Sequence, residues 1–537
     1  MKFSLALGVA MAAVLATSAL AADKFEPSAD NMRAHMTFLA DDLMQGRMPG
    51  TPGYDIAANY VAAQFALLGV KPAGENGTYL QKVPMVSYRP AEQGAISFVG
   101  KGRPVALKFG VDYRPGSDPQ GRKVALTAPM VFAGYGVVAP EKGRDDYAGL
   151  DVKGKIVVLL SGAPKGFQTE ERAYYAGRHK RIEAARRGAV GILTVMTPTA
   201  ERTHPFAKGN MHWRDTSMTW SQKDGAPSYV GAPVRSLGTI SQAGAAKLFA
   251  YDPARLAEVM AAAETPDGVT PRFELPVQAK VSLTNEIREV ASSNVVGVIE
   301  GSDPALKGEY IVLSAHLDHV GTSEPVNGDG INNGALDNAG GIATLLEVAR
   351  GFRESGDPPK RSILITAVTA EEQGLIGAEY FAQNPTAPKE ALVANVNLDM
   401  PILLYDFTDV VAFGAERSTI GPAVRRAAES MGVKLSPDPL PDEGLFTRSD
   451  HYRFVEAGIP STFLMTGFAN GGEAKFTEFL AKRYHMPNDD LDQGIDFAAG
   501  AKFAKINYRI ARELADGKER PRWNEGDFFG GKFAAGR

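Results

Sequence analysis

At 537 residues the chain is too long for one ordinary hydrophobic core, so we expect two or more domains. A net charge of −4 gives no electrostatic reason to expect nucleic acid or an anionic membrane as a partner. The chain has no cysteine, which excludes disulfides and thiolate ligands, so a zinc site would have to be built from His, Asp and Glu.

The first 21 residues have the pattern of a secretory signal peptide. Lys2 provides a positive start, residues 5–16 are apolar, and Ala21 ends a small-residue cleavage site. The apolar run is short for a membrane span, so an uncleaved anchor is the less favoured alternative. We therefore predict that the protein is exported to the periplasm or secreted, with no membrane association after cleavage.

The next part of the chain changes from a helical to a strand-like pattern. Apolar residues recur at helical spacing from Asp30 to Leu68, which predicts two helices joined by a loop over residues 46–53. From about residue 96 onward, short apolar runs favour a separate β-rich unit that ends near Asn285. Within that unit the sequence predicts strands over 128–138, 155–160 and 190–195, a helix over 176–188 and a long loop over 197–233.

From Ser292 onward, strands and helices alternate. The predicted strands are 294–299, 310–314, 362–367 and 394–398, and the predicted helices are 339–352 and 375–383. Apolar strands that alternate with helices are typical of an α/β sheet covered on both faces. We therefore predict the α/β fold class, with a three-layer α/β/α domain around a mixed, mostly parallel sheet that the β-rich unit interrupts. Residues 517–537 have no pattern and are treated as a C-terminal tail.

Residues of the metal-ligand type directly follow three of these predicted strands: His316, Asp318, Glu371, Glu372 and Asp399. Open α/β sheets bind their ligands at this edge. Asp337 enters a predicted helix, where it could simply cap free amides, but its company favours a ligand role. Successive side chains of an extended chain point in opposite directions. One glutamate of the pair 371–372 can therefore bind metal while the other contacts the attacking water.

The histidines are not equivalent. His316 ends an apolar strand, where a neutral imidazole needs a partner. Asp318 could hydrogen-bond an imidazole in the site and fix its tautomer. His319 is interpreted as structural. His485 alone would be interpreted as an ordinary loop histidine. It becomes a candidate metal ligand only because the other ligand-type residues are present. The combination predicts a site for one or two borderline metal ions, with one carboxylate left to act as a base.

Six motifs together resemble those of the M28 family of di-zinc peptidases: HLDH, DGINNGALDNAGG, EEQGLIGAEYF, NLDM, RSDHYRFVEAGIP and YHMPNDD. The resemblance covers about residues 22–95 and 292–514. It implies a peptidase domain made of residues 22–95 and 286–516.

The resemblance also implies five ligands for two zinc ions, two for each ion and one shared: His316 with Asp399, Glu372 with His485, and the bridging Asp337. Glu371 is implied to be the general base, and Asp318 the residue that orients a ligand. The peptide bond between Asp337 and Asn338 resembles one that the family often holds in the cis form.

Residues 96–285 resemble a protease-associated (PA) domain. The resemblance rests on the Gly-Lys pair at 154–155 before a buried strand, and on a helix, Gly-Ala and strand over 180–193. No metal or nucleophile pattern lies inside this insert, so we expect it to act as a lid or to select substrates.

The activity implied is that of an exported zinc-dependent exopeptidase acting on peptides or proteins, with an aminopeptidase favoured. The alternatives are a carboxypeptidase or dipeptidase of the same family, a glutaminyl-cyclase-like acyltransferase with one zinc ion, and, least favoured, a non-catalytic binding protein. A free amine could be anchored by an acid of the loop that carries Asp438, Asp442 and Glu443, and a free carboxylate by Arg448. The candidates for substrate binding are Arg448, Asp450, His451 and Tyr484.

Overall fold

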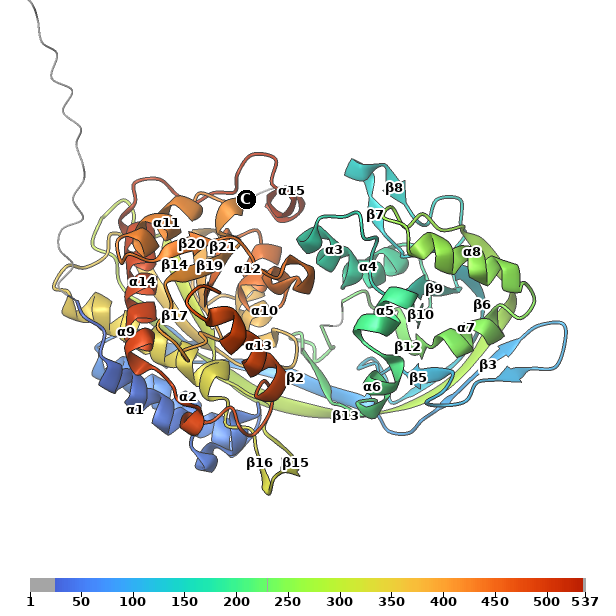
Figure 1. The fold of residues 1–537 in the computed structure, drawn as a ribbon, viewed down its shortest axis with the longest axis horizontal. Helices are drawn as coiled ribbons and strands as arrows, with labels where there is room; N and C mark the ends of the chain where they lie inside the picture. Colours follow the sequence, from blue (N-terminus) through green and yellow to red (C-terminus); the bar gives the residue numbers. More distant parts are fainter. Residues whose placement is uncertain (1–24, 229, 535–537) are drawn as a thin grey trace, which may run out of the picture.

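The structure is a computed structural model that describes residues 25–228 and 230–534, and these residues form two lobes side by side (Figure 1). The larger lobe contains the N-terminal helices and the C-terminal half of the chain, and the smaller lobe contains the middle of the chain. The predicted signal peptide, residues 1–21, lies outside the described residues. Among the described residues, no helix combines the length and apolar composition needed to cross a bilayer.

The larger lobe is built on one mixed sheet with a parallel centre. Its strand order is β11-β2-β13-β17-β14-β18-β21-β19-β20, and β1 pairs with the end of β13. Neighbours from β17 to β21 run parallel, whereas β13 and β19 pair antiparallel to them. The strands are β1 (Lys71–Pro72), β2 (Leu80–Pro90), β11 (Ser217–Trp220), β13 (Phe273–Ile299), β14 (Tyr310–His316), β17 (Ser362–Val368), β18 (Leu392–Leu398), β19 (Asp409–Phe413), β20 (Lys434–Ser436) and β21 (Ser461–Thr466), and the separate hairpin is β15 (Thr322–Val326) and β16 (Asp329–Ile331).

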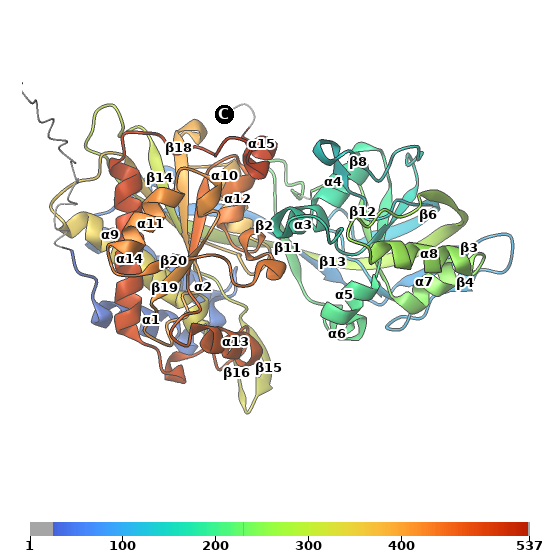
Figure 2. The ribbon, with the colours of Figure 1, turned by 45° about the horizontal axis from the view of Figure 1, so that its top comes forward.

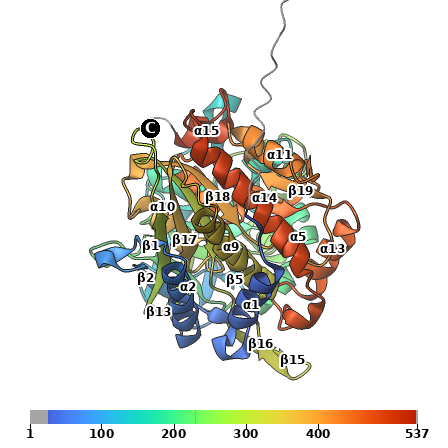
Figure 3. The ribbon, with the colours of Figure 1, turned by 90° about the vertical axis from the view of Figure 1, so that its left-hand side faces the viewer.

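Helices cover both faces of this sheet. On β17, Ile363 and Ile365 join the core under α1, α2, α9 and α14, whereas Leu364 and Val368 point to the opposite face and pack with α10 and α12. Figure 3 shows the first helix layer lying across the sheet. The predicted α/β class with a mixed, mostly parallel sheet is therefore confirmed. The helices of this lobe are α1 (Ala29–Leu39), α2 (Pro52–Leu67), α9 (Gly340–Glu354), α10 (Ile376–Gln383), α11 (Gly421–Glu429), α12 (His451–Glu456), α13 (Gly472–Lys482), α14 (Phe497–Asp516) and α15 (Phe528–Phe533).

The smaller lobe has its own sheet and its own hydrophobic core. Strands β6, β9, β10 and β12 run parallel in that order, and β13 pairs antiparallel with β6 and β3. Its strands are β3 (Ala95–Val99), β4 (Val105–Ala106), β5 (Tyr113–Pro115), β6 (Lys123–Phe132), β7 (Val138–Ala139), β8 (Arg144–Asp145), β9 (Ile156–Leu160), β10 (Gly191–Val195) and β12 (Arg235–Ile240). Its helices are α3 (Thr169–Ala176), α4 (His179–Arg186), α5 (Pro198–Thr203), α6 (Phe206–Met211), α7 (Gln242–Leu248) and α8 (Pro253–Ala263).

One long strand, β13, joins the two lobes. Its 27 residues pair first with β6 and β3 in the smaller lobe and then with β2 and β17 in the larger lobe. The predicted domain boundary at residues 285 and 286 lies inside this strand. The division into 22–95, 96–285 and 286–516 stays a prediction, as does the assignment of the insert as a PA domain.

One local prediction in the insert was wrong. The stretch 197–233 is not a loop throughout, because it contains α5, α6 and β11. β11 is only four residues long, too short to show a periodic pattern, and it pairs with β2 in the larger lobe. The helix expected over 176–188 is present as α4, which begins at His179 because α3 ends just before it, at Ala176 with Gly177 as its C-cap.

Candidate metal centre

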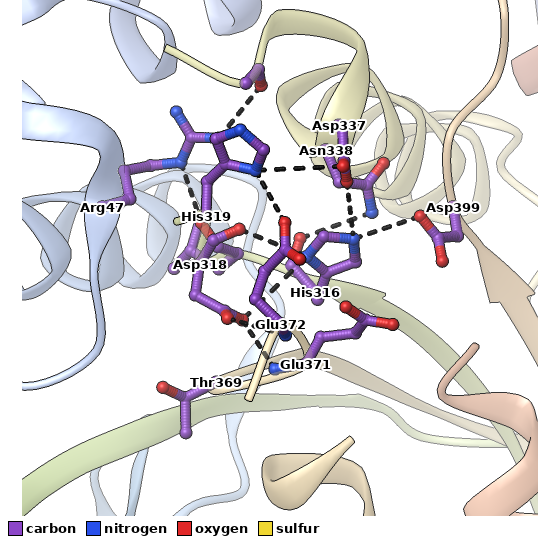
Figure 4. A network of polar contacts seen from close by, with 12 residues as sticks. Arg47, His316, Asp318, His319, Asp337, Asn338, Thr369, Glu371, Glu372 and Asp399 are labelled. Atoms are coloured by element: carbon purple, nitrogen blue, oxygen red, sulfur yellow. Dashed lines mark hydrogen bonds and ion pairs between the residues drawn. The ribbon is translucent and has the colours of Figure 1, made fainter. Parts of the chain in front are cut away.

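The predicted ligand-type residues meet at one edge of the larger sheet. β14, β17 and β18 are parallel neighbours, so the residues that follow them lie at the same end of the sheet. Asp337 reaches this edge from the helical turn before α9, and His485 from the loop after α13. Figure 4 shows most of these side chains pointing toward one another. The peptide bond between Asp337 and Asn338 is cis, as predicted.

One group of ligand atoms surrounds His316. Its Nε2 lies 3.1 Å from Oδ1 of Asp399 and 3.3 Å from Oδ1 of Asp337. All three side chains are buried, and their ligand atoms lie within 4.8 Å of one another, close enough to hold a metal ion. His316 and Asp399 are thus brought together as the sequence motifs implied.

A second group surrounds Glu372. Nε2 of His485 lies 2.9 Å from Oε2 of Glu372 and 3.4 Å from Oδ2 of Asp337. Asp337 therefore presents Oδ1 to the first group and Oδ2 to the second. A carboxylate placed in this way can bridge two metal ions.

His319 belongs to this second group, although the sequence reasoning treated it as structural. Its Nδ1 lies 2.7 Å from Oε1 of Glu372 and 3.9 Å from Oδ2 of Asp337, and the three residues form a further potential metal-binding group. Its Nε2 is buried without a hydrogen-bond partner among the described residues. The sequence signal for this role was the position of His319, which follows the end of β14 only three residues after His316.

Asp318 lies beneath the site and orients its backbone. Its carboxylate accepts hydrogen bonds from the backbone N–H groups of Glu371 (3.1 Å) and Glu372 (3.3 Å). The predicted contact with the imidazole is made instead by the backbone carbonyl of Asp318, which lies 3.2 Å from Nδ1 of His316, while the carboxylate is 4.0 Å away. Burial raises the pKa of Asp318 to about 6.

Glu371 lines the cavity beside both groups of ligand atoms but belongs to neither group. Burial raises the pKa of Glu371 well above its usual value; the nearby His316 lowers it, and the carboxylates of Asp399 and Glu372 raise it further. A carboxyl group with a raised pKa can both take and return a proton near neutral pH.

Backbone strain is concentrated around these residues. Ala370, Met400 and His485 have φ angles of 55°, 40° and 57°, in the left-handed region that non-glycine residues rarely adopt. Ala370 precedes the glutamate pair and Met400 follows Asp399. Each such residue costs about 1 kcal/mol, and clusters of them occur mainly where function fixes the backbone.

The donor set fits one or two zinc ions. Five buried or nearly buried carboxylates meet here. A fixed positive charge close to them is the guanidinium of Arg47, which is itself buried and donates to the backbone carbonyls of Leu317 and Asn333. So many carboxylates in a low-dielectric site require compensating cations. Imidazole and carboxylate are ligands that zinc accepts in the absence of thiolates.

A cavity of about 80 Å³ adjoins the ligands His316, Asp337 and Asp399. Its wall is mostly apolar, with Met400, Leu440, Leu445, Phe463, Met465, Phe476 and Leu480. Two of the four residues predicted to bind substrate, Arg448 and Tyr484, line it. Of the three acids considered as amine anchors, only Glu443 lines this cavity, and its carboxylate lies 3.6 Å from the guanidinium of Arg448. Asp442 pairs with Arg172 of the insert, and Asp438 lines a different cavity.

The other two predicted substrate residues, Asp450 and His451, do not line this cavity. Both have 0% of their surface exposed, because they begin helix α12, which packs into the core. The imidazole of His451 lies between the rings of Phe446 and Phe463, 5.2 and 5.5 Å away. Both carboxylate oxygens of Asp450 are buried without a hydrogen-bond partner among the described residues. Neither side chain can contact a substrate in this structure, which corrects that part of the prediction.

His451 should make the stability of the protein depend on pH. Burial lowers the pKa of His451 to about 3, whereas an unfolded chain binds this proton near pH 6.5. The free energy of unfolding should therefore fall as the pH is lowered from 6.5 toward 3, by about 1.4 kcal/mol per pH unit from this residue. Denaturant titrations between pH 4 and 8 give the free energy of unfolding at each pH. This free energy should depend less steeply on pH in His451→Phe than in the wild type. The control His204→Phe, at an exposed histidine, should keep the wild-type slope.

The fold and the site together define an α/β domain with a buried carboxylate–imidazole centre at the carboxyl edge of its sheet. Residues 294–511 match the model of Peptidase family M28. This region therefore belongs to peptidase family M28, as the motifs predicted.

Several known proteins are similar to the chain. A "Probable zinc metalloprotease" from Pyrenophora tritici-repentis is 37% identical over 259 residues, which is 43% of this chain and 58% of that protein. "Probable leucine aminopeptidase 2" from Aspergillus fumigatus is 26% identical over 40% of this chain and 43% of that protein. The chain thus spans only about half the length of these relatives. The solved structure of an aminopeptidase from Aneurinibacillus sp. strain AM-1 shares the fold, with a TM-score of 0.52 and 20% identity over 93% of this chain and 95% of that one.

Proposed function

We propose that the protein is a zinc-dependent exopeptidase of the aminopeptidase type that uses two zinc ions. The observation that carries this proposal is the position of Asp337, whose two carboxylate oxygens face two separate ligand groups, with Glu371 at the adjoining cavity. The relatives named zinc metalloprotease and leucine aminopeptidase support the same class of activity.

The ligands assigned to the two ions are His316 and Asp399 for one, Glu372 and His485 for the other, and Asp337 for both. Zinc bound there would supply Lewis acidity, which polarises a substrate carbonyl and lowers the pKa of a water molecule. His319 holds Oε1 of Glu372 by a hydrogen bond and so leaves Oε2 directed toward His485. Asp318 fixes the turn that carries both glutamates through their backbone amides.

Glu371 moves the proton in this proposal. Its carboxylate accepts a proton from the attacking water and then returns it to the nitrogen of the leaving amine. Burial and the neighbouring carboxylates raise its pKa, which makes the return of the proton favourable. The apolar wall excludes bulk water from the reacting bond.

The cavity wall supports a choice between an aminopeptidase and a carboxypeptidase. An aminopeptidase places the side chain of the first residue beside the metal ions, and the cavity offers an apolar wall at that place. Glu443 could hold the free amine. Arg448 favours the second candidate, a carboxypeptidase or dipeptidase, since a guanidinium binds a free carboxylate. Its charge is offset by Glu443, 3.6 Å away, and for this reason we rank the aminopeptidase first.

Hydrolysis of matched peptides decides between these candidates. A free tripeptide with an apolar first residue, its N-acetylated form and its C-amidated form should be assayed with chelator and with added zinc. An aminopeptidase cleaves the free and amidated peptides and spares the acetylated one. Cleavage of the acetylated peptide and not of the amidated one would establish the carboxypeptidase. Cyclisation of an N-terminal glutamine without hydrolysis would establish the glutaminyl-cyclase-like alternative.

We also propose that the protein is exported and that residues 96–285 act as a PA-type lid or substrate selector. The N-terminal pattern described above supports export to the periplasm or secretion. Cell fractionation followed by N-terminal sequencing should find the mature chain outside the cytoplasm, beginning at Ala22. A cytoplasmic protein that begins at Met1 would contradict the export proposal.

A further inference from the structure

The C-terminal residues end in a short helix that lies between the two lobes. Helix α15 is placed beside α3 of the insert in both views of the ribbon (Figures 1 and 2). Asp527 caps it by accepting a hydrogen bond from the backbone N–H of Gly530 at 2.8 Å. The side chain of Phe529 is fully buried, so this residue anchors the helix to its surroundings.

The aromatic side chains of α15 contact both lobes at once. On the insert side, the ring of Tyr174 in α3 lies 5.6 Å from Phe528, 6.4 Å from Phe529 and 6.0 Å from Phe533, measured between centroids. On the other side, the ring of Phe529 lies 5.0 Å from Phe446 and 5.9 Å from Tyr452. We call these six residues the interlobe aromatic cluster.

Charged residues reinforce the same junction. Arg417 is 7% exposed at its side chain and pairs with Glu170 of α3 and, at 2.9 Å, with Asp527. Its guanidinium also lies over the rings of Phe446 and Phe529, 5.2 and 4.9 Å from their centroids. A single cation thus ties the insert, the larger lobe and the C-terminal helix together, and its low exposure protects these pairs from screening by salt.

The junction adjoins the wall of the candidate substrate cavity. Phe446 lies in the short helix Leu445–Thr447, between two residues that line the cavity, Leu445 and Arg448. Helix α3 also contacts this segment directly, because Arg172 pairs with Asp442 at 2.7 Å. The cavity wall over residues 440–448 is therefore held from behind by α3 and α15.

We propose that Phe529 is a positioning residue that, through Phe446, fixes the cavity wall over residues 440–448 and so sets the preference for large apolar side chains. The insert and the C-terminal helix then select substrates without touching them. Packed aromatic faces have discrete arrangements, so loss of one ring allows the wall to move as a unit. This proposal rests on the proposed peptidase function for its substrate class.

The kinetic test compares two substrates in the full-length enzyme. Phe529→Ala should raise KM about three- to tenfold for a substrate with a leucine or phenylalanine first residue, the effect of losing an aromatic contact. For an alanine first residue, KM and kcat should change less than twofold, and zinc content should stay at the wild-type value. Phe529→Leu should recover most of the change. The control Lys71→Gln, which removes an exposed ion pair with Glu300 outside the interlobe aromatic cluster, should match wild type.

A second measurement does not depend on activity. Hydrogen exchange at the backbone amides of residues 440–448 should be faster in Phe529→Ala than in wild type. Tyr174→Ala, which removes the insert side of the same cluster, should have the same effect and serves if Phe529→Ala does not fold. Unchanged exchange in the folded variants would overturn the proposal, and so would an equal change in KM for both substrates. A wild-type protein without peptidase activity would refute the proposed function, and the exchange result alone would then decide whether the helix fixes the wall.

Discussion

Glu371→Gln should reduce kcat for peptide hydrolysis by about 10²- to 10⁴-fold, the range that a positioned general base contributes. The amide cannot accept the proton of the attacking water, although it has the size of the carboxylate. Zinc content should remain close to wild type, because Glu371 belongs to neither ligand group. Steady-state kinetics and metal analysis on the same preparation measure both quantities.

The control for this variant is Glu354→Gln, which removes a half-exposed carboxylate on the outer surface of α9 and should leave kcat unchanged. The pH profile gives a further check. Glu371 must be ionised to act, so the wild-type rate should fall as the pH is lowered through its raised pKa. Full activity of Glu371→Gln would show that another group moves the proton.

Asp337→Asn should abolish binding of both zinc ions and with it the stabilisation that zinc gives. Asp337 is the one ligand shared by the two groups, and an amide does not replace a bridging carboxylate. At a free zinc concentration 100 times the dissociation constant, the wild type should gain about 2.7 kcal/mol in free energy of unfolding for each zinc ion bound. The variant should gain nothing, and thermal unfolding with and without zinc measures the difference.

An aspartate far from the site provides the comparison. Asp357→Asn removes an exposed carboxylate that pairs with Arg512, and this variant should respond to zinc as the wild type does. The account would be wrong if Asp337→Asn kept the zinc-dependent rise in Tm. Loss of only half of the bound zinc would show that Asp337 serves one ion and not two.

The sequence predicted the site better than the architecture around it, for physical reasons. The strands that lead to His316, Glu371 and Asp399 are mostly apolar and adjacent in a parallel sheet, so their ends had to meet. Asp337 and His485 reach the site from segments without periodicity, and only the other ligand-type residues and the family motifs indicated them.

Burial and long-range packing could not be read from the sequence in this way. Asp450 and His451 stand in a polar motif beside Arg448, yet the first turn of α12 turns them into the core. β13 passes through both lobes without interruption, so the change of pattern near Asn285 marks a change of partner strands and not the end of an element. The burial of Phe529 depends on Tyr174 and Phe446, which are far from it in sequence.

We propose that Asp337 stands between two zinc ions. An anomalous difference map at the zinc absorption edge, from a crystal of the zinc-loaded protein, tests it most directly. Our account predicts two peaks, one beside His316 and Asp399 and one beside Glu372 and His485, with Asp337 between them. A single peak would contradict the two-ion site and favour the cyclase-like alternative, and a map without a peak would contradict the metal centre itself.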